Sequence, residues 1–168
     1  APTATAAASA TRNNKIGIIG TTATIKSGSY KRELLKINPN LQIFEQDCPL
    51  FVPLVENGFI EKDNKATLII AEKYLAGLRN KKIDTLILGC THYPYLLDKL
   101  AKYAPQDLFI NPAQLFANYI KQDLLKHNIL NTDSSGSVSY FASSEPDVFK
   151  KNAKLFLEID SLPQLVEL

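Results

Sequence analysis

The chain has 168 residues, of which 45% are hydrophobic and 21% are charged, values that are ordinary for a folded globular protein. Nineteen basic and seventeen acidic residues give a net charge of +2, which favours neither a nucleic-acid partner nor a membrane surface. No apolar run reaches the roughly 18 residues that span a bilayer. Two cysteines are too few for a disulfide scaffold, so a reducing compartment is expected.

The first half of the chain alternates short apolar runs with helical spacing. Residues 15–20, Lys-Ile-Gly-Ile-Ile-Gly, lie between turn residues, which predicts a buried parallel strand. Helical spacing follows over residues 21–36, and a second strand is expected at residues 41–44. Asp63 is the expected N-cap of a helix that reaches about Leu78.

The second half continues the same alternation. Residues 83–89 form the clearest strand, and a leucine stripe at helical spacing follows them. The other expected elements are a strand at residues 108–110, a helix capped by Asn111 with Pro112 at its first position, a polar turn at residues 131–137, a strand at residues 138–141 and a last helix opened by a capping box at Ser144. Strands that alternate with helices predict right-handed βαβ units. The expected fold is therefore a three-layer αβα, flavodoxin-like α/β domain with a parallel sheet.

Two turns at strand ends are candidate sites, because ligands bind at the carboxyl ends of strands in open α/β sheets. The first is Gly-Thr-Thr-Ala-Thr at residues 20–24. Gly20 permits a tight turn, and backbone amides at a helix N-terminus together with the hydroxyls of Thr21 and Thr24 would suit an anion. The alternative is a plain strand-to-helix turn with a threonine N-cap. The sequence is neither a dinucleotide nor a P-loop motif, so both interpretations stay open.

The second turn is Gly-Cys-Thr-His-Tyr-Pro at residues 89–94. Cys90 falls at the end of a strand, and Pro94 fits an early helix position. A helix N-terminus and a nearby imidazole are the usual means of raising the thiolate fraction of a cysteine, so Cys90 and His92 are a candidate reactive pair. The alternative is a small buried cysteine that closes a strand, with His92 as a loop hydrogen-bonding residue.

The remaining polar candidates carry weaker signals. Residues 48–55 are apolar but interrupted by prolines, which favours a loop or short helical turns and a packed, structural Cys48. Glu56, which follows, is either a solvated carboxylate or a residue that orients His92 through a hydrogen bond. The two cysteines and two histidines show no metal-ligand spacing, so no metal site is expected.

Three segments together resemble bacterial glutamate racemases, within the aspartate/glutamate racemase superfamily. They are Ile-Gly-Ile-Ile-Gly-Thr-Thr-Ala-Thr-Ile-Lys-Ser at residues 16–27, Cys-Pro-Leu-Phe-Val-Pro-Leu-Val-Glu at residues 48–56 and Leu-Ile-Leu-Gly-Cys-Thr-His-Tyr-Pro at residues 86–94. The third is the most specific, and the segment Tyr-Phe-Ala-Ser at residues 140–143 also fits. The matches occur in the family's order and cover nearly the whole chain.

The resemblance implies a racemase that interconverts L- and D-glutamate without a cofactor, using two cysteines on opposite faces of the substrate α-carbon. Cys90 matches the second of these cysteines, which takes the α-proton of L-glutamate. His92 would assist Cys90, and Glu56 would support His92. Thr21, Thr24 and Thr91 would hold the carboxylate or amino group of the substrate. The resemblance further implies a homodimer in the bacterial cytoplasm that supplies D-glutamate for peptidoglycan.

The motifs of the family's first half, including its other catalytic cysteine, are not found in these 168 residues. We therefore expect an N-terminally truncated enzyme with half a site and little or no activity. Residues 1–10 would be a frayed helix or the remnant of an upstream element. Residues 1–111 would form the second racemase domain, and residues 112–168 a return segment of the incomplete first domain. Without that domain, Phe116, Phe141, Phe149 and Phe156 would lack partners.

Two alternatives remain at this point. One is an aspartate or other amino-acid racemase of the same superfamily. In the resemblance, the histidine after Cys-Thr favours glutamate, because aspartate-type relatives often carry a carboxylate there. The other is a non-catalytic binding domain derived from a racemase.

Overall fold

The protein is described here from a computed structural model, which describes residues 2–131 and 136–167. Its centre is a four-stranded parallel sheet in the order β2-β1-β3-β4. The strands are β1 (Lys15–Gly20), β2 (Gln42–Asp47), β3 (Thr85–Gly89) and β4 (Phe109–Ile110). Strands β1 and β3 are apolar on both faces because helices cover both sides of the sheet. The prediction of a parallel α/β fold is confirmed.

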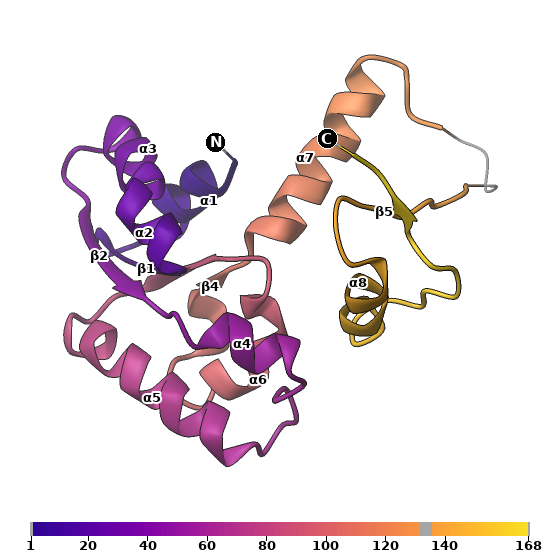
Figure 1. Cartoon of the computed structure of the whole chain (residues 1–168). Helices are drawn as coiled ribbons and strands as arrows, with labels where there is room; N and C mark the ends of the chain where they lie inside the picture. The colour runs from indigo at the N-terminus through magenta and orange to yellow at the C-terminus, as the bar shows by residue number, and fades with distance from the viewer. Residues whose placement is uncertain (1, 132–135, 168) are drawn as a thin grey trace.

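Helices form an outer layer on each face of the sheet (Figure 1). Helices α1 (Pro2–Ala10), α2 (Thr22–Ser27) and α3 (Ser29–Ile37) lie on one face. The other face carries α4 (Phe51–Glu56), α5 (Lys65–Asn80), the 3-10 helix η1 (Tyr93–Leu96) and α6 (Leu97–Leu100). Buried side chains fill both interfaces: Ala7, Ile18 and Leu34 on the first face, Phe51 and Leu75 on the second. The expected three layers are therefore present, and α1 is packed rather than frayed.

Two predicted helix starts on this domain differ from the structure. The helical pattern of residues 21–36 is divided into α2 and α3 at Gly28, whose φ of 60° lies in the left-handed region that glycine adopts without strain. Asp63 is not the N-cap of α5. Asn64 has that role, because its side-chain oxygen accepts a hydrogen bond from the Thr67 amide at 3.1 Å. Asp63 instead lies 3.0 Å from Nζ of Lys102.

The C-terminal part leads away from the sheet (Figure 1). After η2 (Gln106–Leu108), Asn111 caps α7 (Pro112–Lys126) as predicted, and its side chain accepts a hydrogen bond from the Ala113 amide at 3.0 Å. Strands β5 (Phe141–Ala142) and β6 (Gln164–Leu165) pair in parallel beside α8 (Pro146–Ala153). The strand expected at residues 138–141 thus begins later. Most of the polar turn expected at residues 131–137 lies outside the described residues.

The capping box expected at Ser144 is wrong. Glu145 is the N-cap of α8, with a φ of 45° and no side-chain capping hydrogen bond among the described atoms. Proline at the next position disfavours right-handed helical backbone at Glu145, so the chain turns there rather than one residue earlier.

The C-terminal helices are weakly covered. Every residue of α7 and α8 is at least partly exposed, and Phe116 is 56% exposed. Phe141 and Phe149 are exposed as well, although Phe116 lies against Tyr119 and Phe149 against Tyr140, with ring centroids 6.3 and 6.4 Å apart. Phe156 is partly buried, and its ring packs against Tyr95 with ring centroids 4.0 Å apart. In the part of the chain that the structure describes, no helix is long and apolar enough to cross a membrane.

Candidate functional site

The two candidate turns start side by side. In the register of the parallel sheet, Gly20 at the end of β1 is paired with Gly89 at the end of β3. A Cβ atom on Gly89 would lie 2.7 Å from the backbone oxygen of Ile19, so only glycine fits here without moving a strand. The residues that follow both glycines therefore emerge at the same carboxyl edge of the sheet, where α/β folds place their ligands.

The turn after β3 is fixed to the core by Tyr93. The Tyr93 hydroxyl donates a hydrogen bond to the Cys48 carbonyl at 3.2 Å, and its ring packs edge-on against Phe51 with centroids 5.2 Å apart. Pro94 occupies an early position of η1, which is a 3-10 helix rather than the α-helix start that the sequence predicted. Tyr93 is fully buried, so the neighbouring Cys90 and His92 are carried on a rigid turn.

Cys90, His92 and Glu56 form a continuous series of contacts. Sγ of Cys90 lies 3.7 Å from Nδ1 of His92, and Nε2 of His92 lies 3.2 Å from Oε1 of Glu56. Glu56 is the last residue of α4, in the connection that follows β2. Of the two interpretations of Glu56 from sequence, the structure shows the hydrogen-bonded one. A histidine held between a thiol and a carboxylate can accept the thiol proton at Nδ1 while it donates Nε2–H to the carboxylate.

The Cys90 thiol is half-buried, and this burial raises its pKa above the ordinary value for cysteine. Hydrogen bonds from His92 and Thr91 act in the opposite direction, while the negative charge of Glu56 adds to the increase. The two features that the sequence offers in favour of a thiolate, the turn and the nearby imidazole, are therefore outweighed by burial. At neutral pH the thiol form predominates, which suits a proton donor and requires a base before the sulfur can accept a proton.

Cys48 is the fully buried, structural cysteine that the sequence predicted. It is in the core cluster on the α5 side of the sheet, and its Sγ lies 3.7 Å from the Gln46 carbonyl. Burial and the nearby Asp47 raise the pKa of the thiol far above its ordinary range. Cys48 therefore offers no reactive thiolate to the carboxyl edge of the sheet.

Thr21 and Thr24 are hydrogen-bonded to each other. Oγ1 of Thr21 accepts a hydrogen bond from the Thr24 amide at 3.2 Å, and the two hydroxyl oxygens are 2.9 Å apart. Thr21 is thus the N-cap of α2, as the plainer interpretation of this turn had it. Helix α2 has only six residues, which is too short to make its N-terminus an anion site by itself.

A small hollow of about 110 Å³ lies against Cys90 and Thr91. Tyr30 and Asn111 also line the hollow, although the sequence predicts no site role for Tyr30 and only a capping role for Asn111. Tyr30 is half-buried. Burial, followed by the nearby Cys90, raises the pKa of its hydroxyl, which therefore stays protonated as a donor. The position of Tyr30 on α3 gave no signal, because it is set by the contact between α3 and the end of β3.

A second hollow, of about 350 Å³, is lined by His92 and Glu56. Phe149 and Phe156, from α8 and the residues that follow it, line its far wall. The contact series from Cys90 to Glu56 thus lies between two recesses, each of which includes one end of the series.

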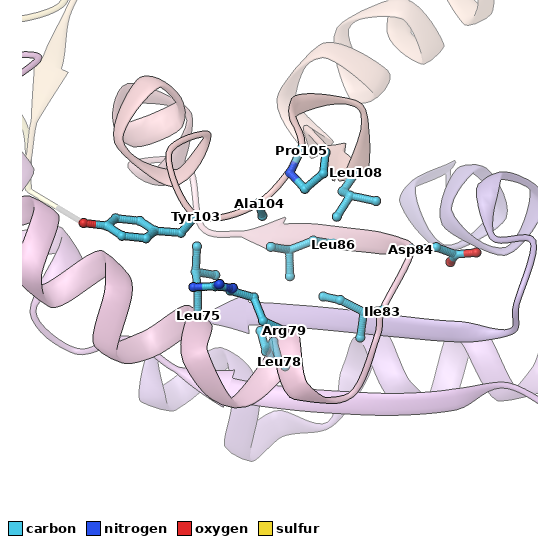
Figure 2. Close-up of a pocket in the computed structure, with 10 residues that line it drawn as sticks. All are labelled: Leu75, Leu78, Arg79, Ile83, Asp84, Leu86, Tyr103, Ala104, Pro105 and Leu108. Atoms are coloured by element: carbon cyan, nitrogen blue, oxygen red, sulfur yellow. The ribbon is translucent and has the colours of Figure 1, made fainter.

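A third pocket lies at the opposite end of β3 and is mostly apolar (Figure 2). Its volume is about 350 Å³, and leucine, isoleucine and tyrosine side chains form most of its wall. Asp84 at its edge accepts hydrogen bonds from the hydroxyl of Thr11 and the amides of Arg12 and Asn13. The pocket contains neither cysteine nor histidine among its lining residues, so the candidate site remains at the carboxyl edge of the sheet.

No group of three or more histidine, cysteine or carboxylate side chains within residues 2–131 and 136–167 is arranged to hold a metal ion.

Comparison with known proteins adds an independent observation. The family model for Asp/Glu/Hydantoin racemase matches residues 1–120, which include both candidate turns. The chain belongs to the Asp/Glu/hydantoin racemase family. Its relatives within this family include the glutamate racemase of Chlorobaculum parvum, which is 42% identical over 153 residues. That alignment covers 90% of this chain and 56% of the relative, so the chain spans little more than half the length of this curated protein.

Solved structures of racemases share the fold. Glutamate racemase isoform RacE1 from Bacillus anthracis has a TM-score of 0.89 at 30% identity, over 99% of this chain and 62% of that one. A glutamate racemase from Francisella tularensis, solved in complex with D-glutamate, has a TM-score of 0.83 at 30% identity, over the same shares of the two chains. The three-layer architecture of this racemase-family chain is therefore that of glutamate racemases.

Proposed function

We propose that this chain carries one half of a glutamate racemase active site, in which Cys90 exchanges a proton with the α-carbon of glutamate. The contact series Cys90–His92–Glu56 at the carboxyl edge of the sheet is the observation that carries this proposal. The relatives named glutamate racemase, one of them solved with D-glutamate, support the choice of substrate.

In the proposed reaction, His92 first takes the Cys90 proton at Nδ1, which leaves a thiolate beside an imidazolium. Glu56 stabilises that imidazolium by accepting Nε2–H. The thiolate then removes the α-proton of L-glutamate, so that an S–H bond forms, the C–H bond breaks and the electron pair stays on the α-carbon. In the opposite direction, the Cys90 thiol donates its proton to the carbanion. The raised pKa of Cys90 is consistent with a thiol that rests in the protonated, donor form.

Inversion needs a second acid on the opposite face of the α-carbon, because a single base returns the proton to the face from which it came. Cys48 cannot be that acid, since it is fully buried. We infer that the opposing thiol comes from outside these 168 residues. Thr91 lines the hollow beside Cys90 and would hold a polar group of the substrate there. Thr21 and Thr24 would do so only after their mutual hydrogen bond opens.

The biological setting follows from the same proposal. D-glutamate would be supplied in the bacterial cytoplasm for peptidoglycan, and the complete enzyme would be a homodimer that needs no cofactor. The bacterial sources of the glutamate racemase relatives support this setting.

The test is proton exchange in D₂O, followed by ¹H NMR with L-glutamate and D-glutamate in separate samples. We expect loss of the α-proton signal from L-glutamate alone, because Cys90 faces one side of the substrate. Cys90→Ala should abolish the exchange, while Cys48→Ala, the matched thiol control, should retain it in folded protein. Exchange of both enantiomers would contradict the half-site and reveal a second base. Exchange of neither by folded protein would reject a working half-site in this chain.

A further inference from the structure

Lys99 is a buried cation that has no part in the proposed reaction. Its side chain is 1% exposed, although lysine almost always extends its ammonium group to water. The ammonium donates a hydrogen bond to the backbone carbonyl of Ile60 and lies 2.8 Å from Oδ1 of Asp98. A buried charge is costly unless it is paired and hydrogen-bonded, so these contacts must be maintained for Lys99 to stay inside.

The contact with Ile60 belongs to a series that joins two segments of the chain, residues 56–63 and residues 92–102. Glu56 contacts His92 at 3.2 Å, Ile60 accepts the hydrogen bond from Lys99, and Asp63 lies 3.0 Å from Lys102. The Asp63–Lys102 pair is exposed to water, so it contributes little to holding the segments together. The central contact, made by Lys99, is the buried one. It therefore contributes to the spacing of the two segments, together with the packing of Phe51 against Tyr93.

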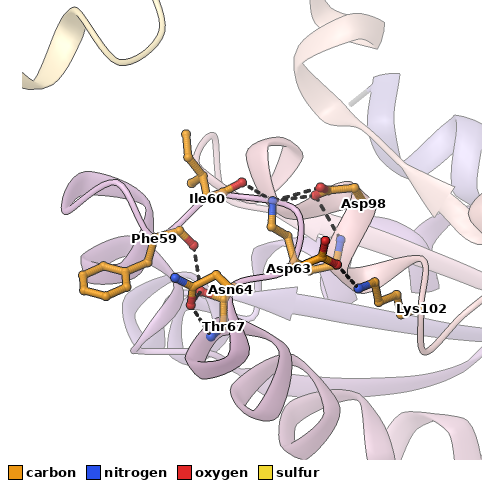
Figure 3. Close-up of polar contacts among 8 residues, drawn as sticks. Phe59, Ile60, Asp63, Asn64, Thr67, Asp98 and Lys102 are labelled. Carbon is orange, nitrogen blue, oxygen red and sulfur yellow. Dashed lines mark hydrogen bonds and ion pairs between the residues drawn. The ribbon is translucent and has the colours of Figure 1, made fainter.

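The turn between Glu56 and Ile60 has little freedom. The Gly58 amide donates to the Val55 carbonyl at 3.0 Å, and the Phe59 amide donates to the Leu54 carbonyl at 2.9 Å. The Thr67 hydroxyl donates to the Phe59 carbonyl at 2.7 Å, which fixes the same turn to α5 (Figure 3). A displacement of Ile60 would thus be passed on to the end of α4, where the Glu56 carboxylate is.

We propose that Lys99 is a positioning residue: through Ile60 it holds the end of α4 so that Glu56 accepts Nε2–H of His92. That hydrogen bond selects the imidazole tautomer in which Nδ1 is the free acceptor facing Cys90. The inference rests on the proposed function, in which this tautomer takes the thiol proton.

The first test reads the tautomer and needs no activity. The ¹⁵N chemical shifts of His92, recorded where the imidazole is neutral, distinguish protonated Nε2 from protonated Nδ1. We expect Nε2–H in the wild type and a mixture in Lys99→Met, which fills the same space without the ammonium. Lys102→Met, the matched control at the exposed contact, should retain the wild-type tautomer. An unchanged tautomer in folded Lys99→Met would overturn the proposal. If that variant does not fold, Lys99→Gln, shorter by one bond, is judged by the same criterion.

The second test is a double-mutant cycle on the exchange of L-glutamate. Lys99→Met should lower kcat about tenfold with little change in KM, because it displaces a group that assists proton transfer and leaves substrate contacts intact. In a Glu56→Gln background the same substitution should have no further effect, since Lys99 acts through Glu56. Additive losses would overturn the proposal. Absence of exchange in the wild type would count against the proposed function alone, because the tautomer comparison still decides the role of Lys99.

Discussion

Sγ of Cys90 lies 3.7 Å from Nδ1 of His92, and only one residue separates them along the chain. The turn after β3 therefore brings thiol and imidazole together by itself, whereas the carboxylate on the far side of the imidazole comes from a different connection of the sheet.

This arrangement predicts the pH dependence of Cys90 alkylation. Because burial raises the pKa of the thiol, the thiolate is scarce at neutral pH and increases as the pH rises toward that pKa. Alkylation by iodoacetamide should therefore accelerate by about tenfold per pH unit through the neutral range, since only the thiolate reacts. Mass spectrometry would follow both cysteines, and Cys48 should remain unmodified in folded protein. A rate at Cys90 that is already maximal at mildly acidic pH would contradict the prediction.

Adding a single methyl group at Gly89 is expected to lower the stability of the folded protein. In Gly89→Ala the new Cβ would lie 2.7 Å from the Ile19 carbonyl oxygen, so two paired strands must separate, at a cost of about 1–3 kcal/mol. Gly77 in α5 is the matched control, because no described atom lies within 4 Å of the corresponding Cβ position. Gly77→Ala should stabilise the protein by about 0.5–1 kcal/mol, since alanine favours helix. Urea denaturation would measure the free energy of unfolding of both variants, and equal values for the two would contradict the prediction.

Phe51 and Phe116 provide a second matched pair. Phe51 is fully buried between the rings of Tyr74 and Tyr93, at centroid distances of 5.1 and 5.2 Å. Phe51→Ala should therefore reduce the free energy of unfolding by about 3–5 kcal/mol. Phe116→Ala, on the exposed side of α7, should change it by no more than about 0.5 kcal/mol. A comparable loss in both variants would show that α7 is covered in solution.

Asp84 predicts an acid-dependent loss of stability. Partial burial acts to raise the pKa of this carboxyl, but hydrogen bonds from Thr11, Arg12 and Asn13 outweigh it, so the pKa is lowered in the folded state. The stabilisation is therefore present above the unfolded pKa of about 3.9 and is lost as the pH falls through the folded value. Asp84→Asn should be less stable than the wild type at neutral pH, and the difference should shrink below about pH 4. Asp107→Asn, an exposed control, should show no such trend. A constant difference for Asp84→Asn would reject the linkage.

Much of the fold could be predicted because its signals are local. Strands β1 and β3 are buried and mostly apolar on both faces, which is typical of a parallel sheet covered by helices. Cys90 and His92 could be selected as candidate site residues because both directly follow the end of a predicted strand. The start of a helix is harder to predict where two neighbouring residues can both be the N-cap, as Asp63 and Asn64 can at α5.

The rest depended on contacts between distant segments. Glu56 is 36 residues from His92, so from the sequence its contact with the imidazole is one of two interpretations and otherwise rests on the family resemblance. Lys99 lies within the leucine stripe of residues 96–100, and its burial depends on the hydrogen bond to the distant Ile60 carbonyl. The raised pKa of Cys90 also arises from packing around the strand end, which sequence spacing does not describe.

The thiol and its supporting groups are held by separate parts of the architecture. The paired ends of β1 and β3 position the Cys90 sulfur at the carboxyl edge of the sheet. The connection between β2 and α5 positions the Glu56 carboxylate beside the imidazole. Substitutions in residues 57–64 would therefore act first on the carboxylate and on its contact with the imidazole, because the sulfur is on the strand side of the turn. A fold built in this way lets variation in a surface connection alter the support of the imidazole, while the strand ends that carry the thiol stay the same.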